Sequence, residues 1–208
     1  MPPTTPIAAT KTAALARVLD SVPKGYHRYT MGTIKAEKAE YLARKFHAIY
    51  GIGCSPAQRL SRKAKGLANA LLVLHWPEGS NEVQWLLLAT DGAGLQHEKM
   101  RSVKDKPHMR WLGYELVRYT TRGRVSWTWR RPKDDMRELH LLVATQAARR
   151  QYSALRDTLA RAARQPGFHG VRTQTKSLCA LARRSGYAES PPPLFYAQKV
   201  SHGPRLEL

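Results

Sequence analysis

The chain is short of cysteine: Cys54 and Cys179 are the two in its 208 residues. They are far apart and match no metal-ligand spacing, which excludes a zinc site of the paired-cysteine type. The spacing neither requires nor rules out a disulfide. We therefore expect a reduced, cytoplasmic protein without a metal or another cofactor.

Long apolar segments are also missing from the sequence. No run of about 18 apolar residues could span a bilayer, and the first residues, "MPPTTPIAATKTAA", lack the apolar middle of a secretory signal. Binding to an anionic membrane surface is disfavoured because the basic residues are spread over the whole chain instead of lying on one amphipathic segment. The expectation is a protein with no membrane partner.

Acidic residues are scarce. The chain has 15 Asp and Glu against 35 Lys and Arg, a formal net charge of +20. Such an excess repels itself unless something anionic neutralises it, and nucleic acid is the leading candidate. DNA and RNA fit equally well, and other protein subunits of a nucleoprotein complex are further expected partners.

The pattern predicts one α+β domain over residues 1–208, which is long enough to bury a core. Residues 1–7, rich in Pro and Thr, read as a loose arm before a short helix that ends near Pro23. A strand or extended segment is expected over residues 25–34. Residues 35–50 then place Ala39, Leu42, Phe46 and Ile49 on one helical face. Ser55 and Pro56 form a helix-start pair for a helix to about residue 66, so the two helices could form a helix-turn-helix.

Two hairpins follow. "NALLVLHW" and "VQWLLLAT" are apolar at nearly every position and predict paired strands covered on both faces. A long polar loop over residues 91–110 leads to the second hairpin, 111–119 with 124–130, giving an antiparallel sheet of about four strands. Residues 132–186 then predict a helical part: one helix to about Gln165, bent near Arg149, and another over residues 171–184.

The stretch "YELVRYTTRGRVSWTWRR" combines aromatic and arginine residues in the second hairpin. On its second strand Val125, Trp127 and Trp129 share one face, while Ser126, Thr128 and Arg130 share the other. The simplest packing places the tryptophans in the core and the Ser/Thr/Arg face outward. Stacking of nucleic-acid bases on Trp127 or Trp129 is the alternative.

Phosphate contacts are expected from basic residues in four segments: the helix 55–66, the loop, the second hairpin and the last helix. A solvated surface helix is the competing interpretation of the first segment. The candidate residues are Arg59, Arg62, Lys63, Lys65, Lys99, Arg101, Lys104, Lys106, Arg110, Arg118, Arg122, Arg124, Arg130, Arg131, Arg172, Lys176, Arg183 and Arg184.

Catalytic signatures are weak. Asp91, Glu98 and Glu115 form a carboxylate set of a kind expected by chance, so they indicate no metal-dependent nuclease. "TDGAG" at residues 90–94 lacks the ending of a P-loop and predicts a tight turn. Metal-free RNA cleavage leaves no spacing signature; His27 with Tyr26 and Tyr29, or His108 beside Arg110, could perform it.

These observations predict a basic DNA- or RNA-binding protein without enzymatic activity, in overall character like proteins encoded by plasmids, phages and other mobile elements. No motif attaches it to a named family. The alternatives left open are a nucleic-acid-processing enzyme, either a metal-free ribonuclease or a weakly marked nuclease, and a structural subunit that mainly binds protein.

Overall fold

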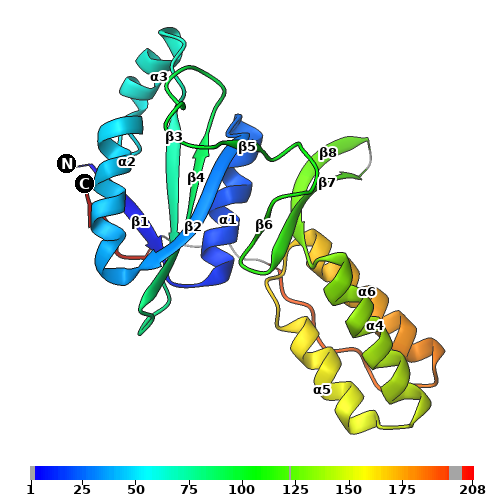
Figure 1. Cartoon of the computed structure of the whole chain (residues 1–208). Coiled ribbons are helices and arrows are strands. Elements are labelled where there is room, and N and C mark those ends of the chain that lie inside the picture. The colour runs from blue at the N-terminus through cyan, green and yellow to red at the C-terminus, as the bar shows by residue number, and fades with distance from the viewer. Residues whose placement is uncertain (1–2, 122, 197–202) are drawn as a thin grey trace. The chain divides into compact units, whose positions relative to one another are not determined.

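The computed structural model describes residues 3–121, 123–196 and 203–208 and has a mixed α+β fold (Figure 1). The chain packs into two compact units: unit 1 comprises residues 1–108 and 199–208, and unit 2 comprises residues 109–198. The single domain expected from the sequence stays a prediction.

Unit 1 is built on a mixed six-stranded sheet, where the sequence predicted an antiparallel sheet of about four strands. The strand order is β5-β2-β4-β3-β1-β9, and β1 runs parallel to β3 while the other pairs are antiparallel. The strands are β1 (Thr4–Ala8), β2 (Arg28–Lys35), β3 (Ala70–His75), β4 (Glu82–Ala89), β5 (Arg101–Ser102) and β9 (Arg205–Glu207). The predicted β3–β4 hairpin is present, but the second hairpin belongs to another sheet.

Residues 4–8 form strand β1 although the sequence indicated a loose arm over residues 1–7. Ile7 lies opposite Leu74 of β3, and Thr5 lies opposite Leu206 of β9. Backbone hydrogen bonds to both neighbours order the segment because they satisfy its donors and acceptors on two sides. The partner in β3 lies about 70 positions away in the sequence and the partner in β9 about 200, so no local sequence pattern predicts this strand.

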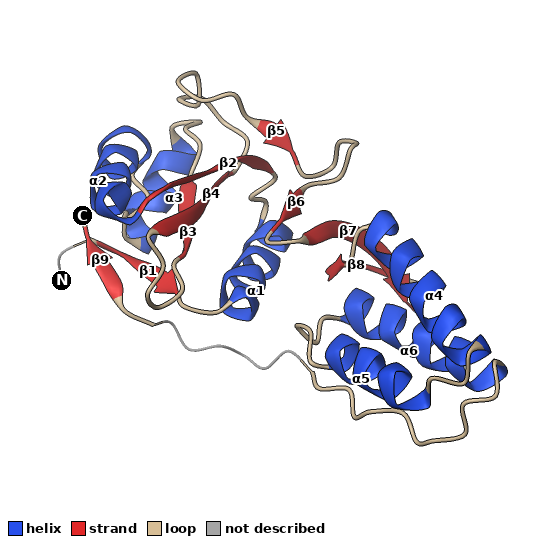
Figure 2. Cartoon of the chain, turned by 60° about the horizontal axis from the view of Figure 1, so that its bottom comes forward, coloured by secondary structure: helices blue, strands red, loops and turns tan. Residues whose placement is uncertain are grey.

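Helices cover both faces of the unit-1 sheet. The first is α1 (Lys11–Ser21), followed by α2 (Ala39–Tyr50) and α3 (Pro56–Ala64). Phe46 of α2 packs with Leu72, Leu74 and Leu87 in one core cluster. Figure 2 shows α1 on the opposite side of the strands from α2. All six residues of β3 are therefore buried, as its continuous apolar sequence predicted.

Unit 2 combines a small antiparallel sheet with a helical bundle. Strands β6 (Arg110–Trp111), β7 (Tyr114–Thr121) and β8 (Arg124–Arg130) pair in that order. The helices are α4 (Lys133–Ala148), α5 (Tyr152–Ala163) and α6 (His169–Arg184), and their apolar faces meet in a cluster around Val143, Leu159 and Leu178. The predicted helical C-terminal part is confirmed.

The bend expected near Arg149 is a complete break between α4 and α5. Arg150 has a φ of 54°, in the left-handed region that ends helices, and α5 starts two residues later. The chain can then turn back, so α4 and α5 both pack against α6.

Both faces of the β7–β8 hairpin contain buried residues. Trp129 is fully buried, as the core interpretation predicted, whereas Trp127 is half-buried and Val125 is 53% exposed. The face with Ser126, Thr128 and Arg130 does not point outward as a whole. The Thr128 hydroxyl accepts a hydrogen bond from the Gly170 N–H at 3.0 Å, so α6 packs on this face.

Gly170 explains how α6 approaches the hairpin so closely. A Cβ at this position would lie 2.5 Å from the Trp129 carbonyl oxygen. Glycine is therefore needed for this contact. The prediction that Thr128 points outward was wrong because α6, which covers it, follows about 40 residues later in the chain and no local pattern indicates the contact.

Within the described residues, no helix is both long enough and apolar enough to cross a membrane. The thiols of Cys54 and Cys179 are free.

Candidate nucleic-acid interface

Helix α3 begins as the sequence indicated, with a capping box. Ser55 accepts a hydrogen bond from the Gln58 N–H, the Gln58 side chain accepts one from the Ser55 N–H, and Pro56 occupies the first turn. None of the residues of α3 is buried, and even Leu60, the large apolar residue of this helix, is 71% exposed. The side of α3 that contacts the protein is formed by arginines instead.

Arg59 and Arg62 bind backbone carbonyls of unit 1. Arg62 donates to the Ala68 oxygen from Nε at 3.3 Å and from Nη2 at 2.9 Å, and Arg59 Nη2 donates to the Ile52 oxygen at 3.3 Å. Both side chains are half-buried. These contacts satisfy carbonyls beside α3, so the two arginines support the fold; this revises their expected role as freely available phosphate contacts.

Lys63 and Lys65 are exposed at the C-terminal end of α3. The chain there runs beside the loop that follows β4: the Ala68 N–H donates to the Ala93 oxygen, and the Ala93 N–H donates to the Gly66 oxygen. Leu67 and Ala93 form a parallel bridge. The turn predicted at "TDGAG" thus joins the loop to the end of α3.

Two of the three carboxylates of this loop are engaged by basic partners, and the third, Asp105, is exposed. Asp91 forms a 2.9 Å ion pair with Arg28 of β2, and Glu98 lies 3.9 Å from Lys45 of α2. The hydrogen bond and charge of Arg28 lower the pKa of Asp91, and the charges of His27 and Lys104 lower it further. Lys104 therefore lies near the Arg28–Asp91 pair.

Further exposed cations lie on these segments of unit 1. They have no ion-pair partner within the part of the chain that the structure describes, and they come from the end of α3, the loop and β5. We call them the α3–β5 surface: Lys63, Lys65, Lys99, Arg101, Lys104 and Lys106. The structure thus brings the first two predicted segments together.

In unit 2 the predicted arginines of the hairpin divide into two groups. Arg118 and Arg124 are exposed, and the Arg118 guanidinium lies 5.7 Å from the centre of the Trp127 ring. Nearby, Tyr119 stacks on His169 of α6, with ring centres 4.3 Å apart and planes 10° from parallel. Arg122 lies outside the described residues.

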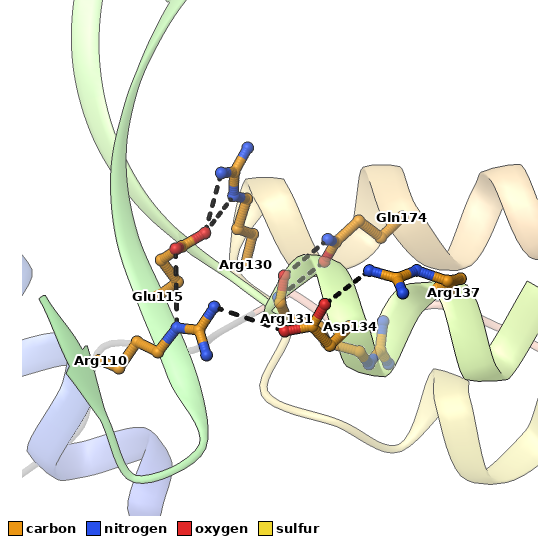
Figure 3. A network of polar contacts seen from close by, with 7 residues as sticks. All are labelled: Arg110, Glu115, Arg130, Arg131, Asp134, Arg137 and Gln174. Atoms are coloured by element: carbon orange, nitrogen blue, oxygen red, sulfur yellow. Dashed lines mark hydrogen bonds and ion pairs between the residues drawn. The ribbon is translucent and has the colours of Figure 1, made fainter. Parts of the chain in front are cut away.

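Arg110 and Arg130 belong to a polar network around Glu115 (Figure 3). Arg130 binds the buried Glu115 carboxylate at 2.8 Å, and Arg110 Nε lies 3.8 Å from the same group. Arg110 also lies 4.0 Å from Asp134, which pairs with Arg137 at 2.7 Å. Arg130 is thus paired closely inside unit 2, whereas the side chain of Arg110 is 54% exposed, and the phosphate contacts expected of both stay predictions.

Arg131 is a buried structural residue. Its guanidinium donates to the Ala162 oxygen at 2.8 Å and to the Thr175 hydroxyl at 3.2 Å, while its backbone exchanges two hydrogen bonds with the Gln174 side chain. Burial lowers its pKa. With 6% of its surface exposed it is inaccessible to a phosphate, so its assignment as a phosphate contact was wrong.

Helix α6 offers exposed cations on the side away from the bundle core: Lys176, Arg183 and Arg184. Arg172 is held differently. It donates to the Gly167 oxygen at 2.6 Å and lies 3.8 Å from the centre of the Tyr196 ring.

The carboxylates considered for metal-dependent catalysis form no metal-binding cluster within either unit, as far as the chain is described. No cluster of three or more metal-ligating residues occurs among the described side chains. Asp91 and Glu98 of unit 1 and Glu115 of unit 2 are each engaged by a basic residue. Tyr29 is buried, and burial raises the pKa of its phenol.

One group of cations was missed by the sequence analysis. Arg17 of α1 and Arg205 of β9 lie close enough to act on one another electrostatically, together with Arg59. A signal existed for Arg17, because it sits between Ala14 and Val18 on the side of α1 that packs inward. Arg205 could not be associated with them without knowing that β9 joins the sheet.

Comparisons with protein-family models, curated proteins and solved structures find no match for this chain.

Proposed function

We propose that this protein binds DNA or RNA through the phosphate backbone and does so without catalysing a reaction. A role as a subunit of a nucleoprotein complex, the origin in a mobile element and the cytoplasmic location stay predictions from the sequence.

The observation that carries the proposal is the charge balance of the α3–β5 surface. Asp91 and Glu98 are already held by Arg28 and Lys45, and Asp105 is the one further acid of the loop, so the six exposed lysines and arginines of the surface outnumber the acids left to neutralise them. Uncompensated cations on one surface repel each other and attract a polyanion. Each phosphate they neutralise releases condensed counterions, which favours binding entropically.

Unit 2 supplies a second set of exposed cations: Arg118, Arg124, Lys176, Arg183 and Arg184. Arg118 is the most specialised of them because its guanidinium lies near the Trp127 ring, and a guanidinium held by an aromatic ring keeps its donors for phosphate oxygens. The half-buried Trp127 could also offer its ring to an unpaired base.

The test is a binding titration with labelled single-stranded DNA, duplex DNA and RNA of one length. The variant replaces Lys63, Lys65, Lys99 and Lys104 by Gln. The matched control replaces four other exposed lysines, Lys24, Lys35, Lys38 and Lys133, and so has the same net charge. We expect the first variant to lose at least tenfold in affinity, the direction expected when several phosphate contacts are lost, and the control to lose much less.

Equal losses in the two variants would show that net charge alone acts and that the α3–β5 surface is no interface. The same samples, incubated with and without EDTA, are expected to leave the nucleic acid intact. The enzymatic alternative would be established if the purified parent protein cleaves the nucleic acid and a His27 or His108 variant does not.

A further inference from the structure

Three arginines of unit 1 meet from distant parts of the chain. Arg17 lies on α1, Arg59 on α3 and Arg205 on β9, three elements that are labelled in Figure 2. Arg59 Nη2 is held by the Ile52 oxygen at 3.3 Å, and Arg205 Nη1 is held by the Thr4 hydroxyl at 3.3 Å. Each contact fixes one corner of a guanidinium and leaves other donors available.

Two guanidinium nitrogens, one on Arg17 and one on Arg59, are buried without a hydrogen-bond acceptor in the described part of the chain. Arg17 Nη1 and Arg59 Nε have no hydrogen-bond partner among the residues that the structure describes. Buried N–H groups are almost always paired, because an unpaired one costs about 1–3 kcal/mol and more when it carries charge. Two such groups on neighbouring arginines indicate a place where an acceptor binds.

No acid among the described residues fills that place. None of the three arginines forms an ion pair with a described carboxylate. Burial, together with the positive charges of Arg59 and Arg205, lowers the pKa of Arg17 to about 10. Like charges therefore act on the Arg17 guanidinium, which is unfavourable until an anion joins them.

We propose that Arg17, Arg59 and Arg205 form a binding site for a phosphate group. Guanidinium forks match the oxygens of phosphate, and phosphate carries up to two charges and several acceptors, enough for more than one fork at once. Arg205 is exposed, so the group can enter from solvent on its side. The proposal does not rest on the α3–β5 surface, which consists of different residues.

The first experiment measures binding of inorganic phosphate to the full chain by calorimetry, at constant ionic strength set with chloride. We expect one site, with affinity reduced about tenfold or more in Arg17→Gln and in Arg205→Gln, because each loses charge-assisted hydrogen bonds. Arg59 is left in place since it also holds Ile52. Lys24→Gln, an exposed change that follows α1, is expected to bind like the parent.

Thermal unfolding separates a binding site from a structural role. Arg17→Gln removes a buried, unpaired charge, so in chloride its melting temperature is expected to equal or exceed that of the parent. In phosphate the parent should melt higher and the variant should not shift. A melting temperature lowered equally in both salts, or phosphate affinity unchanged in both arginine variants, would overturn the proposal.

The source of the phosphate is decided by competition. An oligonucleotide with a 5′-phosphate, the same oligonucleotide with a 5′-hydroxyl, and glycerol phosphate are each added to the phosphate-bound protein. Displacement by both oligonucleotides assigns the site to the nucleic-acid backbone, displacement by the first alone to a terminal phosphate, and displacement by glycerol phosphate alone to a small metabolite. Failure of the nucleic-acid titrations with intact phosphate binding would reject the proposed function and leave this site standing.

Discussion

Arg62 and Lys63 are adjacent in the sequence but meet different surroundings. Arg62 binds the Ala68 carbonyl through two nitrogens, while Lys63 is exposed. The same contrast separates Arg131, buried against Ala162, from the exposed Arg124. A basic residue in this chain is therefore available for a phosphate only if the protein's own carbonyls and carboxylates leave it free.

The two tryptophans of the β7–β8 hairpin are expected to differ. Trp129→Ala should lower the free energy of unfolding by about 3–5 kcal/mol, because it empties a fully buried site. Trp127→Ala should cost clearly less, since its ring is half-buried. Urea unfolding of both variants measures this. A Trp127 variant that unfolds like the parent and loses about 1–3 kcal/mol of affinity would mean that this ring stacks on a base; equal stability losses would contradict the assigned difference in burial.

His75 predicts a pH dependence of stability. Its ring is buried in β3, with Nδ1 3.2 Å from the Ala8 oxygen. Burial lowers its pKa, the charge of Lys11 acts in the same direction, and the hydrogen bond to Ala8 opposes them. The unfolded state, with a pKa of about 6.5, then binds the proton more tightly. This contribution is fully present above that pKa and is lost as pH falls through the lower, folded value.

Unfolding measured between pH 7.5 and 5 should therefore show a loss of stability toward acid that His75→Asn lacks. His97→Asn, on an exposed residue, is the control and should keep the dependence of the parent. An identical pH profile in the His75 variant and the parent would contradict the cost assigned to the buried ring.

At the scale of elements, the local patterns predicted most helices and the β3–β4 hairpin. The start of α3 was readable because Ser55, Pro56 and Gln58 form a complete capping box. The apolar alternation of helix 35–50 correctly indicated that Phe46 is buried. Signals that reside within one element were thus sufficient to locate these elements, although Ile49, expected on the same apolar face as Phe46, is 37% exposed.

Pairings between distant elements could not be predicted. β1 joins β3 and β9, and β9 consists of three residues near the opposite end of the chain. The mixed sheet follows from that pairing, which depends on tertiary contacts and not on propensity. The hydrogen bonds of Arg59 and Arg62 to backbone carbonyls could not be predicted for a related reason, because the carbonyls belong to residues outside α3.

Helix α3 offers a direct test of the division between structural and available cations. Arg62→Gln should lower the free energy of unfolding by about 1–3 kcal/mol, because the Ala68 carbonyl loses its charged donor. Lys63→Gln should change stability by no more than about 0.5 kcal/mol but weaken nucleic-acid binding and reduce its salt slope by about 1. Thermal melts and titrations on both variants decide it. If the two variants lose the same stability and the same affinity, the two side chains have the same role and the division is wrong.

At the scale of the whole molecule, the basic residues behind the formal charge of +20 divide into those bound by the protein's own groups and those exposed to solvent. Arginines hold carbonyls and carboxylates inside both units, as around Ala68 in unit 1 and Glu115 in unit 2. The exposed lysines and arginines of unit 1 and unit 2 retain the excess charge. Composition predicted the class of partner, but it could not assign the roles of individual residues, because those roles depend on which carbonyls the fold brings near each guanidinium.

The most direct test of phosphate recognition is the salt dependence of nucleic-acid affinity. For the parent, the logarithm of the binding constant should fall linearly with the logarithm of salt concentration, with a slope of about −0.7 to −0.9 for each phosphate contacted and several contacts in total. Replacing Lys63, Lys65, Lys99 and Lys104 by Gln should make the slope shallower by about 3, and the equal-charge control should retain it. An affinity that stays flat from low to moderate salt would contradict the account.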